Sequence, residues 1–236
     1  MKIEEVTYLE YKAHFINKIP ELYPIFRQDS KACTFALQYQ GTAHTLVANS
    51  GFSKAEANTI VNNYHTAYTV SAQWAQDKLT EASKTGYVVG AFGIRIRTPI
   101  LLQTIINKAS TPYEAQAESR TAGNALSQSY GLLNNRAAIE FQKRVLASEF
   151  AHAIKPIAHI HDAMYFVVRD EIKTVKWFND NLPDCMAWQK LPELQHNAVK
   201  LSGGVDLFYP NWSEATFLPN NSTEQQILDI CRGKAK

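Results

Sequence analysis

Strand-forming sequence is confined to three short stretches of this chain, and this confinement limits the folds available to it. Residues 86–99 are rich in β-branched side chains and punctuated by glycine, which predicts a hairpin. Residues 154–170 predict two short strands joined by a tight turn at 161–162. Residues 199–212 predict two last strands around a Gly-Gly pair. Neighbouring strands joined by short turns pair antiparallel, so we expect a small antiparallel sheet.

The remaining sequence has the periodicity of helices. Glu56 follows Ser53 at the spacing of a capping box, and Gly86 is placed to end the helix that begins there. We expect helices over residues 28–47, 53–82, 112–150 with an interruption at Gly131, 171–181 and 223–231, the last one after a linker at 220–222. The predicted fold class is therefore α+β, mostly helical, with a small antiparallel sheet.

Composition excludes several classes of protein. The 236 residues are 45% apolar and 19% charged, which supports a packed core and excludes wholesale disorder. A net charge of +2 is too small to predict nucleic-acid binding by itself. Three dispersed cysteines without a CxxC pair exclude a disulfide scaffold and a cysteine zinc knuckle. No stretch reaches the roughly 18–20 apolar residues of a membrane span. The odd number of dispersed cysteines suits a reducing cytosol, so we expect a cytoplasmic protein.

A row of two cations and two aromatic residues is the first candidate site. Arg27, Lys31, Phe35 and Tyr39 follow one another at steps of four residues. Each step turns a helix by only about 40°, so all four residues share one broad helical face. Cations followed by rings suit a nucleoside triphosphate, whose phosphates precede a flat base. The alternative is an amphipathic helix with two surface cations and two core aromatic residues.

A second row, formed by Arg120, Asn124 and Gln128, has the same spacing. It places a guanidinium and two amides on one helical face. These groups can reach phosphates and minor-groove acceptors without requiring a particular base. The alternative is an ordinary solvated polar face.

The third candidate is the sequence His159-Ile-His161-Asp162. Strand alternation would place both imidazoles on one face, with Asp162 at the turn. A carboxylate there can hold a hard cation such as Mg²⁺. Paired histidines with a carboxylate also occur in zinc hydrolases, but no third histidine is spaced for a tetrahedral site. A structural histidine pair is the remaining alternative.

Together the three clusters resemble, in their order, the motifs of family A DNA polymerases of the bacterial DNA polymerase I type. The family's motif B, which is its fingers helix, resembles RQDSKACTFALQYQG, and its palm helix resembles ESRTAGNALSQ. Motif C resembles AHIHDAMYF, and the Asn-Trp near the family's end resembles YPNW. The resemblance covers roughly residues 20–212. TGYVVGAFGIRIRTP and LSQSYGLLNNRAAIEF look most like bacteriophage members, which would place the protein in the host cytoplasm.

The resemblance implies a right-hand fold with fingers and most of the palm. Its implied parts are an N-terminal segment over residues 1–26 leading to the fingers, the fingers over 27–112, the palm over 113–212 and a C-terminal tail over 213–236. In the fingers, Arg27 would hold the outer phosphates of a dNTP, and Lys31 would contact the reacting phosphate and could protonate the pyrophosphate. Phe35 would pack on the sugar, where a tyrosine in this family is associated with tolerance of dideoxy sugars. Tyr39 would stack where the templating base enters.

In the palm, the resemblance implies contacts to the primer–template and to metal. Arg120, Asn124 and Gln128 would contact DNA near the primer terminus. His161 would support the primer end, and Asp162 would bind catalytic Mg²⁺.

Three residues depart from the family's pattern. Ala163 replaces the usual glutamate after the His-Asp pair, and His159 stands where the bacterial type has glutamine. Gln40 separates Tyr39 from Gly41, which are adjacent in most members.

Motif A, an Asp-x-Ser strand that supplies a second metal-binding aspartate, has no counterpart before motif B in this sequence. Two-metal phosphoryl transfer needs carboxylates that bridge both ions. We therefore expect the C-terminal fragment of a split polymerase, with two Mg²⁺ ions shared with a second polypeptide that carries motif A, the thumb and a possible 3′–5′ exonuclease. The alternatives are a non-catalytic polymerase-like subunit that binds primer–template or scaffolds a replisome, and a helical interaction module without a nucleic-acid role.

Overall fold

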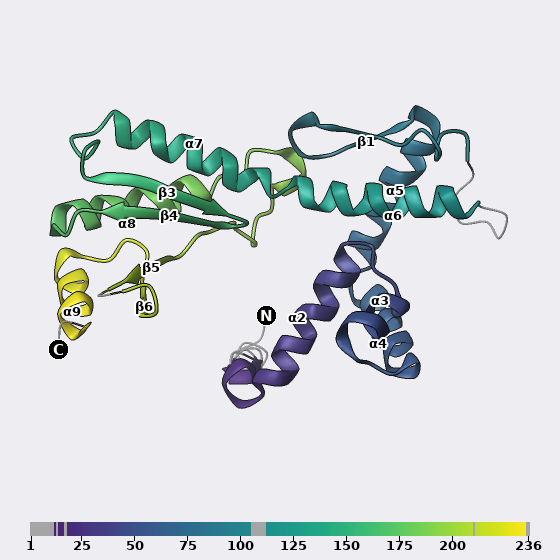
Figure 1. Cartoon of the computed structure of the whole chain (residues 1–236), viewed down its shortest axis with the longest axis horizontal. Coiled ribbons are helices and arrows are strands. Elements are labelled where there is room, and N and C mark those ends of the chain that lie inside the picture. Colours follow the sequence, from purple (N-terminus) through teal and green to yellow (C-terminus); the bar gives the residue numbers. More distant parts are fainter. Residues whose placement is uncertain (1–11, 13, 17, 105–111, 210, 235–236) are drawn as a thin grey trace, which may run out of the picture. The chain divides into compact units, whose positions relative to one another are not determined.

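The computed structural model of the chain describes residues 12, 14–16, 18–104, 112–209 and 211–234. The chain divides into two compact units, Met1–Ser129 and Tyr130–Lys236 (Figure 1). Both units combine helices with two-stranded antiparallel sheets, so the predicted fold class is confirmed. Half of the predicted N-terminal segment 1–26, namely residues 1–11, 13 and 17, lies outside the described residues. No helix in the described part of the chain is long and apolar enough to span a membrane.

The first unit holds two separate hydrophobic cores. Its elements, in order, are α2 (Pro24–Gln38), α3 (Ala43–Ser50), α4 (Lys54–Ala67), α5 (Thr69–Thr85), β1 (Tyr87–Val89), a 3-10 turn (Ala91–Gly93), β2 (Arg95–Arg97) and α6 (Tyr113–Ser129). One core gathers residues of α2, α3 and α4 around Leu37 and Leu46. The other gathers residues of α5, α6 and the β1–β2 hairpin around Leu79 and Leu126.

The helix predicted over residues 28–47 is interrupted, which corrects the prediction. Helix α2 ends at Gln38, and Gln40 adopts a left-handed conformation with φ of 65°. The Gly41 N–H donates to the carbonyl of Ala36 at 2.8 Å, and the Gln40 N–H donates to that of Leu37 at 3.1 Å. This pair of bonds is a Schellman cap, which usually has glycine at the left-handed position. Sequence reasoning missed the end of the helix because glutamine stands there.

The helix predicted over 53–82 begins and ends as expected but is broken once. The Ser53 N–H donates to Glu56 Oε2 at 2.9 Å, and the Glu56 N–H donates to Ser53 Oγ at 3.3 Å, so the capping box is confirmed. Bonding to Ser53 lowers the pKa of the Glu56 carboxyl. Tyr68 leaves helical geometry between α4 and α5, with its ring 4.8 Å from that of Tyr64. Helix α5 then ends at the left-handed Gly86.

The hairpin predicted over residues 86–99 is confirmed. Its register pairs Tyr87 with Arg97, Val88 with Ile96 and Val89 with Arg95. Buried Val88 anchors the hairpin in the second core.

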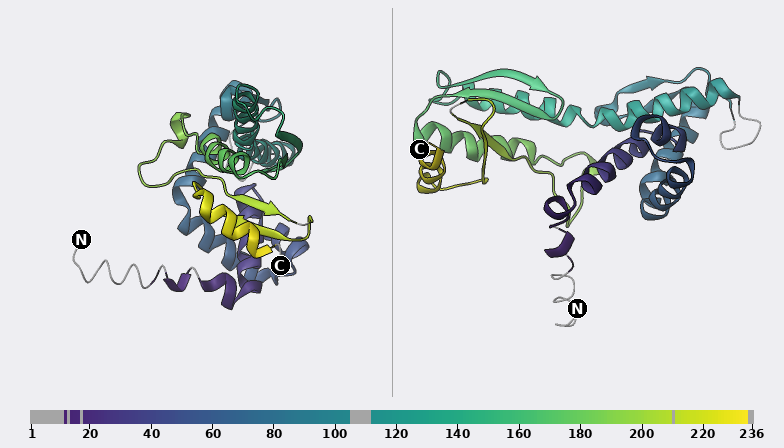
Figure 2. Two further views of the ribbon diagram at one scale, coloured as in Figure 1. Left: turned by 90° about the vertical axis from the view of Figure 1, so that its left-hand side faces the viewer. Right: turned by 60° about the horizontal axis from the view of Figure 1, so that its bottom comes forward.

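The second unit is built around a hairpin covered by two helices (Figures 1 and 2). Its elements are α7 (Leu132–Leu146), β3 (Ile154–Ile160), β4 (Ala163–Val168), α8 (Ile172–Met186), a 3-10 turn (Pro192–Leu194), β5 (Val205–Phe208), β6 (Ala215–Leu218) and α9 (Glu224–Lys234). Met164, Phe166 and Val168 alternate along β4 and pack on the core. The rings of Phe141 and Phe178 meet Phe166 edge-on, with centroids 5.2 Å away in both pairs.

Several boundaries in this unit differ from prediction. The break near Gly131 is confirmed, since α7 begins at Leu132. Helix α8 runs past the predicted end at 181 to Met186, because Leu182 and Cys185 continue its buried face. The last two strands do not flank the Gly-Gly pair. Strand β5 follows the pair, and β6 lies beyond residue 212. The prediction that both strands lie within residues 199–212 was therefore wrong for the second strand.

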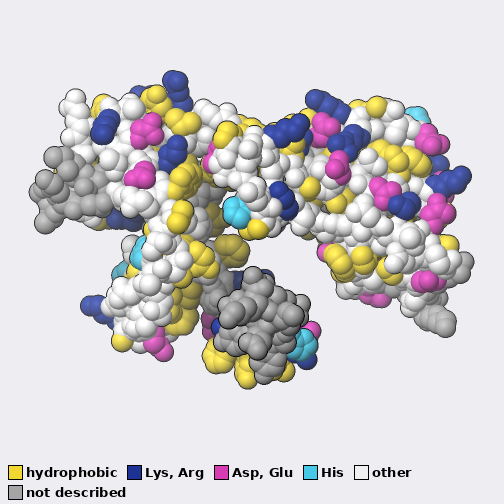
Figure 3. Space-filling model, turned by 180° about the vertical axis from the view of Figure 1, so that it is seen from behind, with side chains coloured by type: hydrophobic (Ala, Val, Ile, Leu, Met, Phe, Trp, Pro, Cys, Tyr) yellow, Lys and Arg dark blue, Asp and Glu magenta, His cyan; other side chains and the backbone are white. Residues whose placement is uncertain are grey.

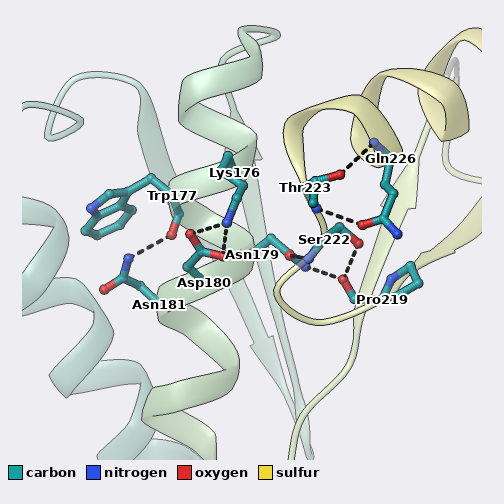
Figure 4. Close-up of polar contacts among 9 residues, drawn as sticks. All are labelled: Lys176, Trp177, Asn179, Asp180, Asn181, Pro219, Ser222, Thr223 and Gln226. Carbon is teal, nitrogen blue, oxygen red and sulfur yellow. Dashed lines mark hydrogen bonds and ion pairs between the residues drawn. The ribbon is translucent and has the colours of Figure 1, made fainter.

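The segment predicted as a linker at 220–222 is a turn that packs against α8 through buried Ser222, while residues 220 and 221 are exposed. Asn179 of α8 is fully buried; its Nδ2 donates to the carbonyl of Pro219 at 3.1 Å, and its Oδ1 accepts from the Ser222 N–H at 2.9 Å (Figure 4). Ile227 of α9 is also buried in the core of this unit. The turn and α9 are therefore part of the folded unit.

Replacing Asn179 with alanine is expected to destabilise the protein by about 2 kcal/mol, because the buried Ser222 N–H would lose its acceptor. Asn181→Ala is the matched control, since the Asn181 amide is half-buried and bonds only to the carbonyl of Trp177 in its own helix. That variant should stay within about 0.5 kcal/mol of wild type. The measurement is denaturant unfolding, and equal losses in both variants would contradict the assignment.

Candidate nucleotide and nucleic-acid site

The four residues of the first row lie on the exposed side of α2. Phe35 is 57% exposed and Tyr39 39% exposed, and Arg27 and Lys31 are also exposed. This exposure excludes the alternative in which both rings are core residues. Tyr39 caps the helix with φ of −90° and ψ of 27°, so three members of the row are helical and the fourth ends it.

The opposite side of α2 explains why the rings of Phe35 and Tyr39 are exposed, whereas residues 24–32 of the helix are exposed on all sides. Cys33 and Leu37 are buried and pack with Leu46 and Ala57. Residues 33 and 35 are separated by about 200° around a helix, so burial of one side turns the other toward solvent. Burial raises the pKa of the Cys33 thiol.

The electrostatics of α2 suit an anion. Its first turn contains no acidic residue, and its N-terminal end carries the positive end of the helix dipole. Arg27 and Lys31 form no ion pair with any residue that the structure describes. Two unneutralised cations one turn apart can therefore meet a polyphosphate, with two rings beyond them for a base or sugar.

The second row lies on α6. Arg120 and Asn124 are half-buried and Gln128 is exposed, while Ala122 and Leu126 on the other side are buried. The Gln128 amide donates to Asn124 Oδ1, and the Arg120 guanidinium lies 6.0 Å from the ring centroid of Tyr113. The row presents amide and guanidinium groups at the surface of the first unit.

One cavity brings the end of α2 and the start of the α6 row together. Its volume is about 770 Å³, and its walls include Gln38, Gln40, Tyr64, Gln76 and Arg120. The Tyr64 hydroxyl donates to Gln38 Oε1 at 2.9 Å, and burial raises the pKa of that phenol. The sequence patterns did not single out Gln38 or this cavity, since its walls come from four helices and the loops between them.

The third candidate is in the second unit, at the turn between β3 and β4. His161 has φ of 54° and lies outside the strand, so the predicted alternation that would pair it with His159 does not hold. His159 pairs with Met164 and Ile160 with Ala163. His161 and Asp162 are both exposed at the turn.

Asp162 can supply one carboxylate ligand of a magnesium site, but not a complete site. Mg²⁺ is commonly held by one or two carboxylates together with substrate phosphates and water. The described residues contain no group of three or more His, Cys, Asp or Glu side chains placed to hold a metal. At the β3–β4 turn they supply the one exposed carboxylate of Asp162, which does not by itself form a two-metal centre.

Charge alone does not mark a DNA-binding face. On the face shown in Figure 3, Lys and Arg side chains are interspersed with Asp and Glu. DNA contact on this face would therefore depend on particular residues rather than on a broad basic surface.

The fold is that of a polymerase domain. It resembles the solved POL domain of Pol1 from M. smegmatis in complex with DNA primer-template and dNTP, with a TM-score of 0.60 and 22% sequence identity. The match covers 78% of this chain and 30% of that chain, so this chain spans less than a third of that polymerase. A comparison with curated proteins finds no match.

The sequence profile described as DNA polymerase family A matches residues 11–212. The chain therefore belongs to DNA polymerase family A.

Proposed function

We propose that this chain is the catalytic C-terminal subunit of a split template-directed DNA polymerase, of the bacteriophage branch, that adds dNTPs to a primer 3′ end. The observation that carries the proposal is the exposed row on α2. Two unpaired cations and two exposed rings share one helical side, opposite the buried Cys33 and Leu37. A scaffold has no need for such a triphosphate-shaped surface.

In this proposal each member of the row has a separate task. Arg27 lies one turn closer to the N-terminus than Lys31, about 6 Å along the axis, which suits the outer phosphates. Lys31 faces the reacting phosphate, where an ammonium can also donate a proton to the departing pyrophosphate. Phe35 packs on the sugar, and Tyr39 stacks at the entry of the templating base. Residues 27–112 would be the fingers and 113–212 the palm.

The α6 row would hold the primer–template. Guanidinium and amide groups contact phosphates and minor-groove acceptors in any sequence, as a polymerase requires. His161 would support the primer end. Swinging of α2 over the nascent pair would exclude water and select the correct dNTP.

The metal site would be shared with another polypeptide. Asp162 would supply one carboxylate, and a motif A strand on the second polypeptide would supply another. Bound Mg²⁺ neutralises charge on the triphosphate. Ala163, where the family usually has glutamate, favours the competing proposal of a non-catalytic subunit that binds primer–template or scaffolds a replisome.

Primer extension tests the proposal directly. The full chain is mixed with a labelled primer–template, dNTPs and Mg²⁺, alone and with a second polypeptide that ends after an Asp-x-Ser strand. We expect extension only in the mixture. Extension by the chain alone would refute the split, DNA binding without extension in both arms would favour the non-catalytic subunit, and failure to shift primer–template in a gel would exclude both.

A further inference from the structure

The two cores of the first unit are joined near the cavity by a small polar contact. The walls of the cavity include Leu37 of one core and Leu79 and Leu101 of the other. Because the cavity separates these side chains, the apolar packing is not continuous there. The contacts at the edge of the cavity therefore link α2 directly to α6, beside the indirect connection through α4 and α5.

Two contacts form that bridge. Ser127 Oγ of α6 donates to the carbonyl of Gln38 at 3.2 Å. One turn earlier on α6, Gly123 lies under the side chain of Gln40 so closely that a Cβ there would be 2.6 Å from Gln40 Cγ and 3.1 Å from its Cδ. Gly123 is itself buried, so Gln40 fills the space that its missing side chain leaves.

The backbone of Gln40 makes this contact unusual. The residue holds φ of 65° at the Schellman position, where glycine is favoured because it lacks a Cβ. Glycine there would relieve the backbone but would leave the hollow over Gly123 empty. The side chain, rather than the conformation alone, thus accounts for a glutamine at this position.

We propose that Gln40 is a positioning residue, which latches the Tyr39 end of α2 to α6 and so fixes where Tyr39 lies beside the primer–template row. Gln40 directly follows Tyr39, and Gly123 lies in the turn between Arg120 and Asn124. The latch therefore joins the ends of the two rows that approach each other. This inference rests on the proposed function for its nucleotide role, but its structural part does not.

A double-mutant cycle tests the contact without using activity. In the full chain, Gly123→Ala is expected to lower Tm by about 2–4 °C, because the new Cβ overpacks against Gln40. In the Gln40→Gly background the same change should raise Tm by about 2–4 °C, since alanine is the better helix former. A change of equal sign and size in both backgrounds would overturn the latch.

Nucleotide kinetics test the positioning role in the assembled polymerase. Gln40→Gly should raise KM for the correct dNTP about tenfold with little change in kcat, because Tyr39 would lose its fixed place. Gln40→Met, which keeps the length of the side chain, should restore KM. An unchanged KM in Gln40→Gly would overturn the role.

Gln103→Gly is the matched control. Gln103 also has a left-handed backbone, with φ of 63°, but it is exposed and its N–H donates to the carbonyl of Ser83 at 2.6 Å. It should leave KM unchanged, and an equal rise in KM would overturn the inference. An inactive wild-type mixture would refute the proposed function and the nucleotide role with it, while the reversal of sign in Tm would still establish the contact.

Discussion

Replacing Asp162 with alanine is expected to abolish primer extension by the assembled polymerase while leaving its affinity for primer–template nearly intact. Asp162 is the one carboxylate at the β3–β4 turn, and in the proposed site it holds part of the Mg²⁺ that neutralises the triphosphate. Loss of comparable charge stabilisation in phosphoryl transfer costs roughly 10³-fold or more in rate. Single-turnover extension and a gel shift with the same primer–template measure the two quantities.

The variant should fold, because Asp162 is exposed and its side chain is not part of the core. The turn itself depends on the left-handed His161 and on the Ile160–Ala163 pair that closes the strands. Asp170→Ala is the matched control, since Asp170 is an exposed carboxylate beyond the other end of β4. Extension by a well-folded Asp162→Ala mixture, or equal loss in Asp170→Ala, would remove Asp162 from the site.

The same experiment separates the catalytic proposal from its rival. Ala163, in place of the carboxylate that the family usually has beside the metal ligand, favours a scaffold subunit. Such a subunit would bind DNA equally well with or without Asp162 and would extend no primer in either form. A catalytic subunit needs Asp162 for extension and not for binding. Loss of primer extension without loss of DNA binding is therefore the informative result.

Local signals in the sequence predicted much of the fold. The capping box of Ser53, the stop at Gly86 and the turn near residues 161–162 each rest on backbone chemistry that a few adjacent residues determine. The break after Gln38 could not be predicted in the same way, because its left-handed residue is a glutamine whose side chain lies over Gly123, 83 positions further along the chain. Tertiary contact there overrides the local preference for glycine.

The candidate site could be predicted only in part, because tertiary contacts also decide which of its residues face solvent. Spacing placed Arg27, Lys31 and Phe35 on one side of a helix, but only the burial of Cys33 and Leu37 decided which side faces solvent. The cavity beside α6 depends on four helices meeting, and no periodicity within one helix can reveal it. The predicted histidine pair failed because strand alternation does not continue into a turn.

Replacing Lys31 with alanine is expected to slow nucleotide addition by about 10²–10⁴-fold, the usual contribution of a positioned general acid. The loss should appear in the single-turnover rate more than in dNTP affinity, because Arg27 remains to hold the outer phosphates. Lys54→Ala is the matched control, since Lys54 is an exposed cation at the start of α4 and outside the row. It should leave the rate unchanged.

Lys31→Arg separates the two tasks assigned to this residue. A guanidinium keeps the positive charge but does not release a proton in the accessible pH range, because its pKa lies well above that range. If Lys31 only attracts phosphate, the arginine variant should recover most of the rate. If Lys31 protonates the pyrophosphate, the variant should retain dNTP affinity and stay slow. A rate equal to wild type in Lys31→Ala would remove Lys31 from the chemistry and leave Arg27 as the only phosphate contact on α2.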